Sequence, residues 1–293
     1  MKKEKNAWKV LITGSGGQLG YELMKRCPAG MECRGADLPE VDITSMDQVG
    51  RLCTEFRPDV LINAAAYTAV DRAETEEAAA RSVNVEGAGN LAAAAKSCGA
   101  RLIHISTDFV FDGASSRPYR VSDPTGPLGV YGKTKILGEK AVLRESPDSV
   151  VIRTSWLYSS HGKNFVRTMI RLMAERKQLK VVCDQVGSPT WAGGLAVALW
   201  STVGKPGMRG IFHWSDNGVA SWYDFAAAIQ EEAVLLGLLR GRTEILPIKG
   251  EEYPTPARRP WYSVMDTSET RKELGLRGVH WRENLRIMLR ELV

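Results

Sequence analysis

The sequence predicts an α/β fold, in which a doubly wound parallel sheet is followed by a smaller C-terminal α/β lobe. In the first half, short apolar runs alternate with helical segments, an order typical of a parallel sheet covered by helices on both faces. After about residue 155 this alternation becomes irregular, and Pro254, Pro256 and Pro260 interrupt an extended segment. The change of pattern therefore indicates a second lobe.

The composition is that of a globular chain about two average domains long. Of the 293 residues, 44% are hydrophobic and 25% are charged, which excludes a disordered or collagen-like chain. No apolar run approaches the roughly 18 residues of a membrane span, and the basic segment 1–9 lacks the apolar stretch of a signal peptide. The net charge is only +5, without a Lys/Arg block that interleaves with aromatic residues. We therefore expect a cytoplasmic protein whose partner is a small molecule, with no nucleic acid and no membrane.

The strands of the first half are predicted from short, β-branched apolar runs that end in glycine or in a polar residue. The segments expected to be strands are 8–13, 32–36, 59–63, 101–106 and 149–154. Helices are expected between them at 19–26, 45–56, 74–98 and 134–144, with the third divided in two near Asn84 or Gly87. These elements supply the parallel sheet and its two helical layers.

The second half mixes longer helices with isolated strands. Its helical segments are 164–176, 192–203, 222–239 and 282–292, and its strand candidates are 179–183, 210–214 and 243–247. We expect one domain to comprise residues 1–155 plus about 191–220. The smaller lobe is then formed by about 156–190 plus 221–293.

Three glycines, Gly14, Gly17 and Gly20, stand directly between the first strand and the first helix. In such a loop the first glycine permits the tight turn, the second lets the backbone approach a pyrophosphate, and the third lets the helix pack closely on the sheet. The helix N-terminus adds amide donors and partial positive charge. The loop therefore predicts a Rossmann-like domain that binds a dinucleotide.

Acidic and small residues at the ends of the next strands fit the same ligand. Asp37 lies 17 positions after Gly20, where a carboxylate can accept hydrogen bonds from ribose hydroxyls and would repel a 2′-phosphate. Asp42 follows a few residues later and can reach the adenine. The small residues Ala64 to Ala66 follow the third strand and let a flat cofactor lie against the backbone. The alternative interpretation is that the acids are solvated and the alanines only begin a helix.

Tyr131 and Lys135 are four residues apart and so share one face of a helix. A nearby ammonium favours the phenolate and lowers the pKa of a tyrosine toward the operating pH, so that the phenol can protonate a developing alkoxide. Ser106 and Thr107 end the fourth strand and offer a hydroxyl to the same carbonyl oxygen. Tyr21 and Lys25 repeat the spacing behind the glycine loop, where they face no reacting carbon.

The order of glycine loop, hydroxyl and Tyr/Lys pair resembles the extended short-chain dehydrogenase/reductase superfamily. More specific strings resemble the dTDP-4-dehydrorhamnose reductase family, and this resemblance extends from Val10 to about Leu292. The strings are NAAAYTAVD at 63–71, STDFVF at 106–111, YGKTKILGEK at 131–140, RTSWLY at 153–158, DQVGSPT at 184–190 and YPTPARRPWYS at 253–263. Departures are few: Phe109 stands where a tyrosine is common, and Trp191 where small residues are common.

The resemblance implies reduction of the 4-keto group of dTDP-4-dehydro-β-L-rhamnose, with hydride from NADH or NADPH. It implies that Tyr131 donates the proton, that Lys135 activates it and binds the ribose, and that Thr107 polarises the keto oxygen. The implied cofactor contacts are Gly17, Gln18, Leu19, Asp37, Asp42, Ile43, Ala64, Ala65 and Ala66, beside Gly14 and Gly20 of the loop. Asp108 and Trp156 are the implied substrate contacts, which makes the smaller lobe the substrate-binding one.

A sugar nucleotide also needs cations for its diphosphate. Arg258 and Arg259 lie in a proline-stiffened loop, and a guanidinium fork suits phosphate oxygens. We expect one of the two to bind the diphosphate. The alternatives are that both arginines are solvated, that Trp156 belongs to the core, and that His104, which alternates with isoleucines, is structural.

Two other functions are compatible with these residues. One is a non-catalytic regulatory subunit, because the β subunit of methionine adenosyltransferase is similar to this reductase family. The other is a sister nucleotide-sugar 4-keto reductase with a different stereochemistry or nucleotide. The intact set of Thr107, Tyr131 and Lys135 favours an enzyme.

Cysteine and histidine usage predicts reduced thiols and no zinc site. The five cysteines are odd in number and form no CxxC pair, and the four histidines share no ligand-like spacing. Some relatives of the family pair through Mg²⁺ held by C-terminal carboxylates, which leaves a homodimer and a Mg²⁺ ion open. Glu283 and Glu291 of the last helix lie among several arginines, which disfavours a strong metal site.

Overall fold

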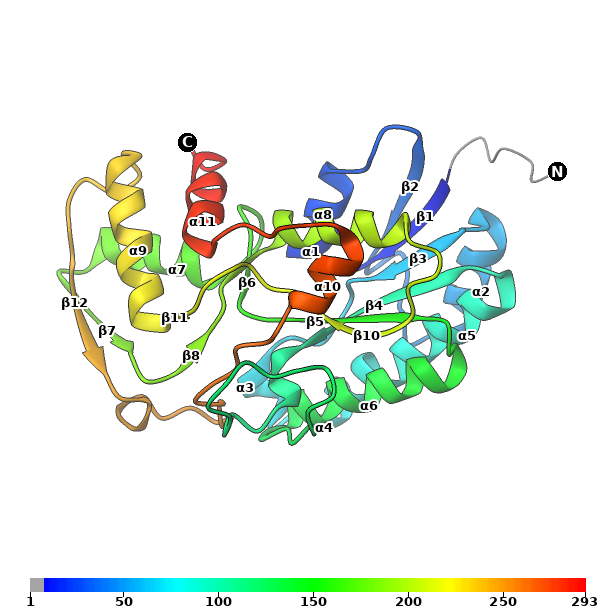
Figure 1. Ribbon diagram of the computed structural model, residues 1–293, viewed down its shortest axis with the longest axis horizontal. Helices are drawn as coiled ribbons and strands as arrows, with labels where there is room; N and C mark the ends of the chain where they lie inside the picture. The colour runs from blue at the N-terminus through cyan, green and yellow to red at the C-terminus, as the bar shows by residue number, and fades with distance from the viewer. Residues whose placement is uncertain (1–7) are drawn as a thin grey trace.

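The computed structural model describes residues 8–293, and in these residues the main sheet has six strands, all parallel (Figure 1). The strand order is β10-β5-β4-β3-β1-β2, so the chain reverses its direction of travel across the sheet between β1 and β3. Ligands of such sheets bind at the carboxyl ends of the strands beside this point. The strands are β1 Trp8–Thr13, β2 Met31–Ala36, β3 Val60–Asn63, β4 Arg101–Thr107, β5 Val150–Thr154 and β10 Gly210–His213.

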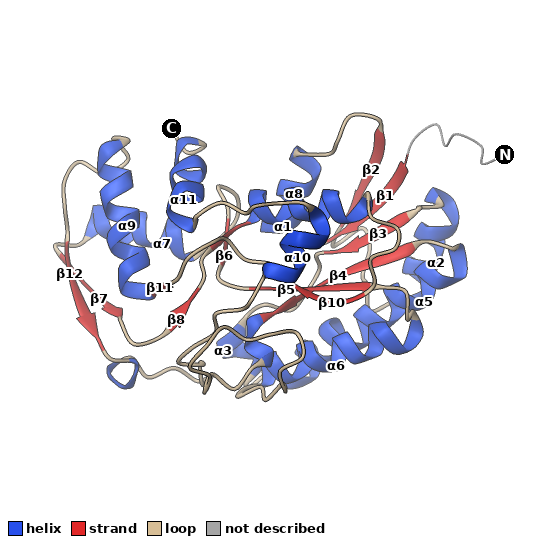
Figure 2. Cartoon of the chain, viewed as in Figure 1, coloured by secondary structure: helices blue, strands red, loops and turns tan. Residues whose placement is uncertain are grey.

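Helices cover both faces of this sheet, as the alternating pattern predicts (Figure 2). Along β1, Val10 and Ile12 pack into one hydrophobic cluster and Leu11 into the other, because successive side chains of a strand point to opposite faces. The first cluster is completed by α1 Gln18–Lys25 and α8 Ala192–Val203, and the second by α2 Met46–Phe56, α5 Ala88–Cys98 and α6 Val130–Glu145. The predicted Rossmann-like fold class is thereby confirmed.

The helical segment expected to break near Asn84 or Gly87 is continuous instead. α4 Glu77–Arg81 runs through a π-helical turn, η1 Ser82–Gly87, into α5. The wider turn places the Asn84 amide where it donates to the Tyr67 carbonyl oxygen, at 3.1 Å, and to the Thr134 hydroxyl, at 3.0 Å. A π-helical turn therefore occurs where the sequence predicted a break between two helices. The short helix α3 Val70–Ala73 precedes this segment.

The second lobe has its own hydrophobic cluster, formed mainly by α7 Phe165–Glu175, α9 Trp222–Leu235 and α11 Trp281–Arg290. Its parallel pair is β7 Gln178–Val182 with β12 Glu244–Ile248, which lies at the outer edge in Figure 1. α9 ends four residues before the predicted boundary of Leu239, at Leu235. The short elements are β6 Leu157–Tyr158, β8 Val186–Gly187, β9 Thr190–Trp191, β11 Ala220–Ser221, η2 Asp108–Val110 and η3 Gly250–Glu252.

The helix α10 Ser268–Leu274 was not predicted, because it is short and mostly polar. It packs on α8 and β10, and Leu274 belongs to the first cluster of the main sheet. The expected division placed residues 221–293 in the smaller lobe. Within that range, α10 packs on the main sheet instead. The two-domain division itself stays a prediction.

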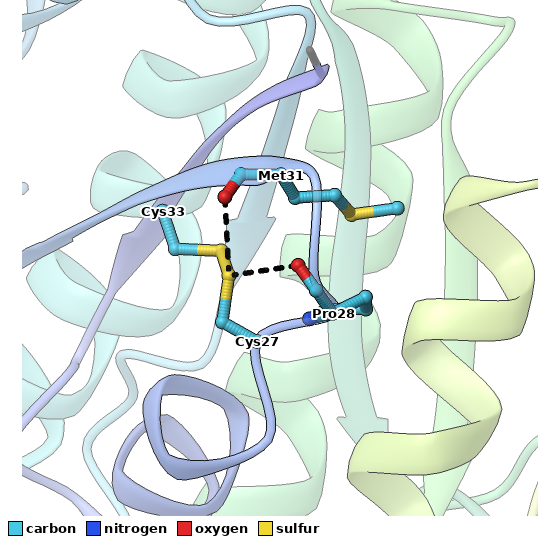
Figure 3. The surroundings of a disulfide bond; sticks show 4 residues. All are labelled: Cys27, Pro28, Met31 and Cys33. Carbon is cyan, nitrogen blue, oxygen red and sulfur yellow. Dashed lines mark hydrogen bonds between the residues drawn. A yellow bond between two sulfur atoms is a disulfide. The ribbon is translucent and has the colours of Figure 1, made fainter.

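The expectation of reduced thiols is wrong for two of the five cysteines. Cys27, just after α1, and Cys33, in β2, form a disulfide (Figure 3). The turn between these elements brings the two Cα atoms to 6.5 Å, within the range that a disulfide spans. The turn brings the two cysteines together, and no spacing motif in the sequence indicates that they pair. Cys53, Cys98 and Cys183 are free, and burial raises the pKa of the Cys53 thiol to about 12.

Within residues 8–293, no helix is long and apolar enough to span a membrane. Most of the basic N-terminal segment, residues 1–7, lies outside the described residues.

Candidate active site

The glycine loop forms the floor of the candidate site. Gly14 has a φ of +73°, and its amide donates to the Ala36 carbonyl oxygen at 2.9 Å. A Cβ atom on Gly20 would lie 2.1 Å from the Gly14 carbonyl oxygen, and one on Gly14 would lie 2.5 Å from the Ala65 amide nitrogen. Only glycine fits at positions 14 and 20, where the loop, the start of α1 and the chain at Ala65 touch. Gly17 is the N-cap residue of α1 and has no side chain to cap it, which leaves the first amides of the helix to an anion.

Asp37 closes the loop from the end of β2. Its Oδ2 atom accepts the Gly16 amide at 2.8 Å, and its Oδ1 atom accepts the Leu38 amide at 2.9 Å. The carboxylate is partly exposed and has lone pairs left, so it can accept ribose hydroxyls beside the loop. The structure thus brings Asp37 together with the three glycines.

Asp42 and Ile43 play a more local part. Asp42 accepts hydrogen bonds from the Thr44 amide and hydroxyl, at 2.9 and 2.8 Å, and so fixes a turn. Ile43 is buried, and a Cβ atom on Gly87 would lie 2.7 Å from its Cγ1 atom. Their contacts hold the loop after β2.

The remaining predicted cofactor residues reach the loop mostly through the backbone. Ala64 donates its amide to the Thr13 carbonyl oxygen at 3.0 Å, and Ala65 to the Asn63 side chain at 3.0 Å, so 64–66 run beside Gly14. The Leu19 side chain is buried in the first cluster, which leaves only its backbone for a ligand. The Gln18 side chain accepts the Asn164 amide at 3.0 Å.

Tyr131 and Thr107 meet at the carboxyl end of β4. Tyr131 is the second residue of α6, and the Thr107 hydroxyl lies close enough to the phenol to lower its pKa. The tyrosine ring also packs edge-on against Phe109, with 5.7 Å between the ring centroids. The predicted proton donor and the predicted polarising hydroxyl are therefore neighbours.

Lys135 lies one turn further along α6, and its environment differs from the predicted one. Its Nζ atom donates to the Ile105 carbonyl oxygen at 2.6 Å, and its side chain is buried. Burial lowers the pKa of Lys135 to about 8, against the opposing effect of the Glu139 carboxylate. Lys135 is thus less basic than a free lysine.

The expected lowering of the Tyr131 pKa is wrong for this structure. Burial and the Asp108 carboxylate raise the pKa of Tyr131 to about 12, and only the hydrogen bond to Thr107 opposes them. Lys135 has no part in this shift, because its ammonium points to the Ile105 carbonyl. The phenol is therefore fully protonated at neutral pH.

Asp108 follows Thr107 and is almost completely buried. Its Oδ1 atom accepts the Thr107 hydroxyl at 3.1 Å. Burial raises the pKa of Asp108 to about 6, and the hydroxyl groups of Ser263 and Thr107 oppose this shift. Ser263 belongs to the C-terminal proline-rich string, so this string approaches the carboxyl group.

Trp156 lies where the chain leaves the sheet for the second lobe. Its φ of +44° is unusual for a residue with a side chain. The indole stacks on Trp222 with 3.5 Å between centroids, and Gly187 leaves it room, since a Cβ atom there would lie 2.5 Å from the ring. The ring is partly buried against the second-lobe cluster and partly open.

Arg258 and Arg259 differ sharply in their contacts. Arg259 forms an ion pair with Asp71 at 2.8 Å and also donates to the Thr255 hydroxyl and the Ala257 carbonyl. Arg258 is exposed and has no ion-pair partner among residues 8–293. Its carbonyl oxygen would lie 3.9 Å from a Cβ atom on Gly129, the N-cap residue of α6. Of the two, Arg258 has the free guanidinium.

Sequence reasoning missed the loop after β6, which lies over the glycine loop. The Nε2 atom of His161 lies 3.0 Å from the Gly16 carbonyl oxygen, and its ring stacks on Tyr21 with 4.3 Å between centroids. Lys25 forms an ion pair with Glu291. The Tyr21/Lys25 repeat therefore serves packing, as expected from its position. No local signal in the sequence points to this loop, because its contacts are more than 130 residues away.

Three other predictions concern single residues. His104 is buried and lies 3.0 Å from the Asn63 amide nitrogen, which fits a structural role. The Ser106 hydroxyl donates to Glu139, so it is directed to α6 and away from Thr107. Within residues 8–293 no group of three or more potential metal-ligating side chains occurs, and Glu291 is taken up by Lys25 and Arg26, so nothing in the structure supports a Mg²⁺ site.

Comparisons with known proteins show the family of this chain. Residues 8–293 match the family model described as the RmlD substrate binding domain. A dTDP-4-dehydrorhamnose reductase of Aggregatibacter actinomycetemcomitans is 42% identical over 285 residues, which cover 95% of this chain and 97% of the relative. The chain belongs to the dTDP-4-dehydrorhamnose reductase family.

One further relative has a different named substrate, and one has a solved structure. A probable dTDP-4,6-dihydroxy-2-methyloxan-3-one 4-ketoreductase of Streptomyces antibioticus is also 42% identical and covers 94% of this chain and 92% of its own. The crystal structure of a Bacillus anthracis dTDP-4-dehydrorhamnose reductase in complex with NADP has a TM-score of 0.92 and 37% identity, covering 97% of this chain and 99% of that one.

Proposed function

We propose that this chain, an oxidoreductase of the dTDP-4-dehydrorhamnose reductase family, reduces the 4-keto group of dTDP-4-dehydro-β-L-rhamnose to give dTDP-L-rhamnose. The observation that carries the proposal is the meeting of Thr107 and Tyr131 at the carboxyl edge of the sheet, with Lys135 one turn away. This edge adjoins the glycine loop, and a solved relative of this name is a complex with NADP.

The residues present fit a reduced nicotinamide dinucleotide. A pyrophosphate fits the glycine loop, which side chains would fill, and the uncapped N-terminus of α1. The Asp37 carboxylate beside the loop suits a ribose. The proposed cofactor contacts are Gly14, Gly17, Gln18, Leu19, Gly20, Asp37, Ala64, Ala65, Ala66, Tyr131 and Lys135, with Asp42 and Ile43 supporting the loop. When bound, NADH or NADPH supplies the hydride.

The catalytic residues manage the proton. Thr107 holds the keto oxygen beside the phenol, and Tyr131 donates its proton to that oxygen as negative charge develops on it. A pKa of about 12 keeps the phenol protonated before the reaction, and Lys135, as a cation one turn further along α6, donates hydrogen bonds to the ribose hydroxyls of the nicotinamide. The site therefore needs a charged Lys135 and a neutral Tyr131 at the same pH.

The sugar nucleotide is proposed to lie between the lobes. Asp108 and Trp156 face the sugar from the end of β4 and from the lobe junction. Arg258 offers its free guanidinium to the diphosphate, while Arg259 fixes the loop through Asp71. In this arrangement residues 253–263 join the second lobe to the active-site edge.

A sister 4-keto reductase is the second candidate, favoured by the Streptomyces antibioticus relative with a different named substrate. A non-catalytic regulatory subunit is disfavoured by the neighbouring Thr107 and Tyr131. The two reductases make different products from the 4-keto sugar nucleotide, and a regulatory subunit makes none.

The experiment is to incubate the protein with dTDP-4-dehydro-β-L-rhamnose and NADH or NADPH, follow the nicotinamide absorbance, and identify the product by NMR. Formation of dTDP-L-rhamnose supports the proposal. A C4 epimer of that product would show the sister reductase. Unchanged absorbance with both cofactors would contradict a reductase, provided that a family member of known activity turns over the same substrate.

A further inference from the structure

Behind Lys135, α6 carries a buried carboxylate that the proposed mechanism does not use. Glu139 follows Lys135 by one turn, as Lys135 follows Tyr131, so the three side chains share one face of the helix. Glu139 is 1% exposed, and Arg153 of β5 is 2% exposed. Two parallel hydrogen bonds join the guanidinium to the carboxylate, at 2.8 and 2.7 Å.

This ion pair is held on several sides. The Ser106 hydroxyl of β4 donates to the Glu139 Oε1 atom, which also accepts the Arg153 Nε–H. The guanidinium lies over the Phe111 ring, 5.2 Å from its centroid, and Nη1 is 3.5 Å from the Nε2 atom of His213. Removing two charges from water is costly, and a buried ion pair is often no more stable than an apolar substitute. Stability alone is therefore a weak reason for this arrangement.

The charges around Lys135 come from several elements. Glu139 is the anion that favours the charged form of Lys135. His104 of β4 stays neutral, since burial and Lys135 hold its pKa well below the usual value, and burial lowers the pKa of His213 of β10 to about 4. Asp108 of η2 acts on Tyr131. Arg153 lies beyond Glu139 and neutralises the pair as a whole.

We propose that Glu139 is a positioning residue, which Arg153 and Ser106 hold in place so that its negative charge keeps the buried Lys135 a cation. The inference rests on the proposed role of Lys135. Glu139 touches neither cofactor nor substrate in this scheme and acts only through Lys135. The Ile105 carbonyl fixes where the ammonium lies, and Glu139 favours its protonation.

The first test needs no cofactor or substrate. Lys135 has a lower pKa in the folded chain than the roughly 10.4 of a free lysine, so between these two pH values the unfolded chain binds more protons. Its contribution to stability therefore rises with pH, from about pH 8 upward. The difference in urea stability between the parent and Lys135→Met, measured against pH, reports this rise.

In a Glu139→Gln background the rise should begin about one pH unit lower, because the anion near Lys135 is gone. Glu145→Gln removes a carboxylate from the far end of α6 and should leave the onset unchanged. Arg153→Lys keeps both charges but loses the paired hydrogen bonds that hold Glu139, so the onset should move part of the way toward that of Glu139→Gln. If Glu139→Gln does not fold, Arg153→Met removes the cation that neutralises Glu139 and should move the onset to a higher pH. An unchanged onset in the folded variant overturns the proposal.

The second test uses turnover with the 4-keto sugar nucleotide. The alkaline limb of the kcat profile should move down by about one pH unit in Glu139→Gln and should return in Glu139→Asp, which restores the charge. A loss of kcat that is equal at every pH would show a merely structural role and overturn the proposal. Because the first test uses the free protein, it can succeed even if the proposed substrate is wrong.

Discussion

At the residue scale, the Tyr131 phenol lies between groups that act on its pKa in opposite directions. Burial and Asp108 raise the pKa, and the hydrogen bond to Thr107 lowers it. The resulting value of about 12 suits an acid that must keep its proton until negative charge develops on the substrate oxygen. The chemistry of the site thus depends on three neighbouring side chains, which belong to α6, β4 and η2.

Replacing Tyr131 by Phe keeps the ring and its edge contact with Phe109 and removes the proton donor. We expect kcat to fall about 10²–10⁴-fold, the usual range for general acid catalysis, with little change in NADH affinity. Steady-state kinetics and a cofactor titration measure the two quantities.

Tyr21→Phe is the matched control, because it keeps the stack on His161 and loses only a hydroxyl. Turnover of Tyr131→Phe at the parental rate would exclude Tyr131 as the acid.

At the scale of elements, the turn between β1 and α1 brings three backbone segments into contact. Gly14, Gly20 and the chain at Ala65 approach so closely that side chains on the two glycines would overlap backbone atoms. Asp37 then joins the end of β2 to the same loop through the Gly16 amide. The geometry of the proposed cofactor site is therefore a property of the loop and its two neighbouring strands.

Gly20→Ala should damage the cofactor site before it damages the rest of the fold. Its Cβ atom would lie 2.1 Å from the Gly14 carbonyl oxygen, so the loop must move. We expect a destabilisation of about 1–3 kcal/mol, typical of overpacking, together with a weakened affinity for NADH. Gly50→Ala in α2 meets no atom within 4 Å and serves as the control. Thermal unfolding and cofactor titration measure both effects, and parental NADH affinity in Gly20→Ala would contradict the placement of the pyrophosphate.

Cofactor preference should follow from Asp37. Its carboxylate favours ribose hydroxyls and repels a 2′-phosphate, while Arg34 of β2, three residues earlier, partly offsets the repulsion. We expect NADH to be used at least as well as NADPH, with both accepted. A hundredfold or greater preference for NADPH in kcat/KM would show that Asp37 does not face the adenosine ribose.

At the scale of the whole molecule, the C-terminal segment ties the two lobes together at the site. Arg259 pairs with Asp71 near α3, Tyr119 and Met265 form a β-bridge, and α10 packs on the main sheet. The C-terminal segment that carries Arg258 therefore contacts the first lobe as well as the second. Binding of a sugar nucleotide between the lobes would engage both.

The two neighbouring arginines should respond differently to substitution. Arg258→Ala removes the free guanidinium, and we expect KM for the sugar nucleotide to rise about tenfold to a hundredfold, since a charged hydrogen bond contributes roughly 1.5–3 kcal/mol. Arg259→Ala breaks the ion pair with Asp71 and should chiefly loosen the loop. Titration of each variant with dTDP alone measures binding without turnover. If both single variants and the double variant bind dTDP as tightly as the parent, the diphosphate lies elsewhere.

The sequence by itself determined the features that depend on neighbouring residues. Apolar runs and glycines predicted the sheet strands within about two residues, and the four-residue spacing placed Tyr131 and Lys135 on one helical face, because backbone geometry is local. Tertiary structure alone decided which groups meet across the chain. It joined Cys27 to Cys33, turned Ser106 to Glu139 and Lys135 to the Ile105 carbonyl, and tied Arg259 to Asp71. Except for the short turn at the disulfide, these contacts join separate elements, whose packing no local pattern encodes.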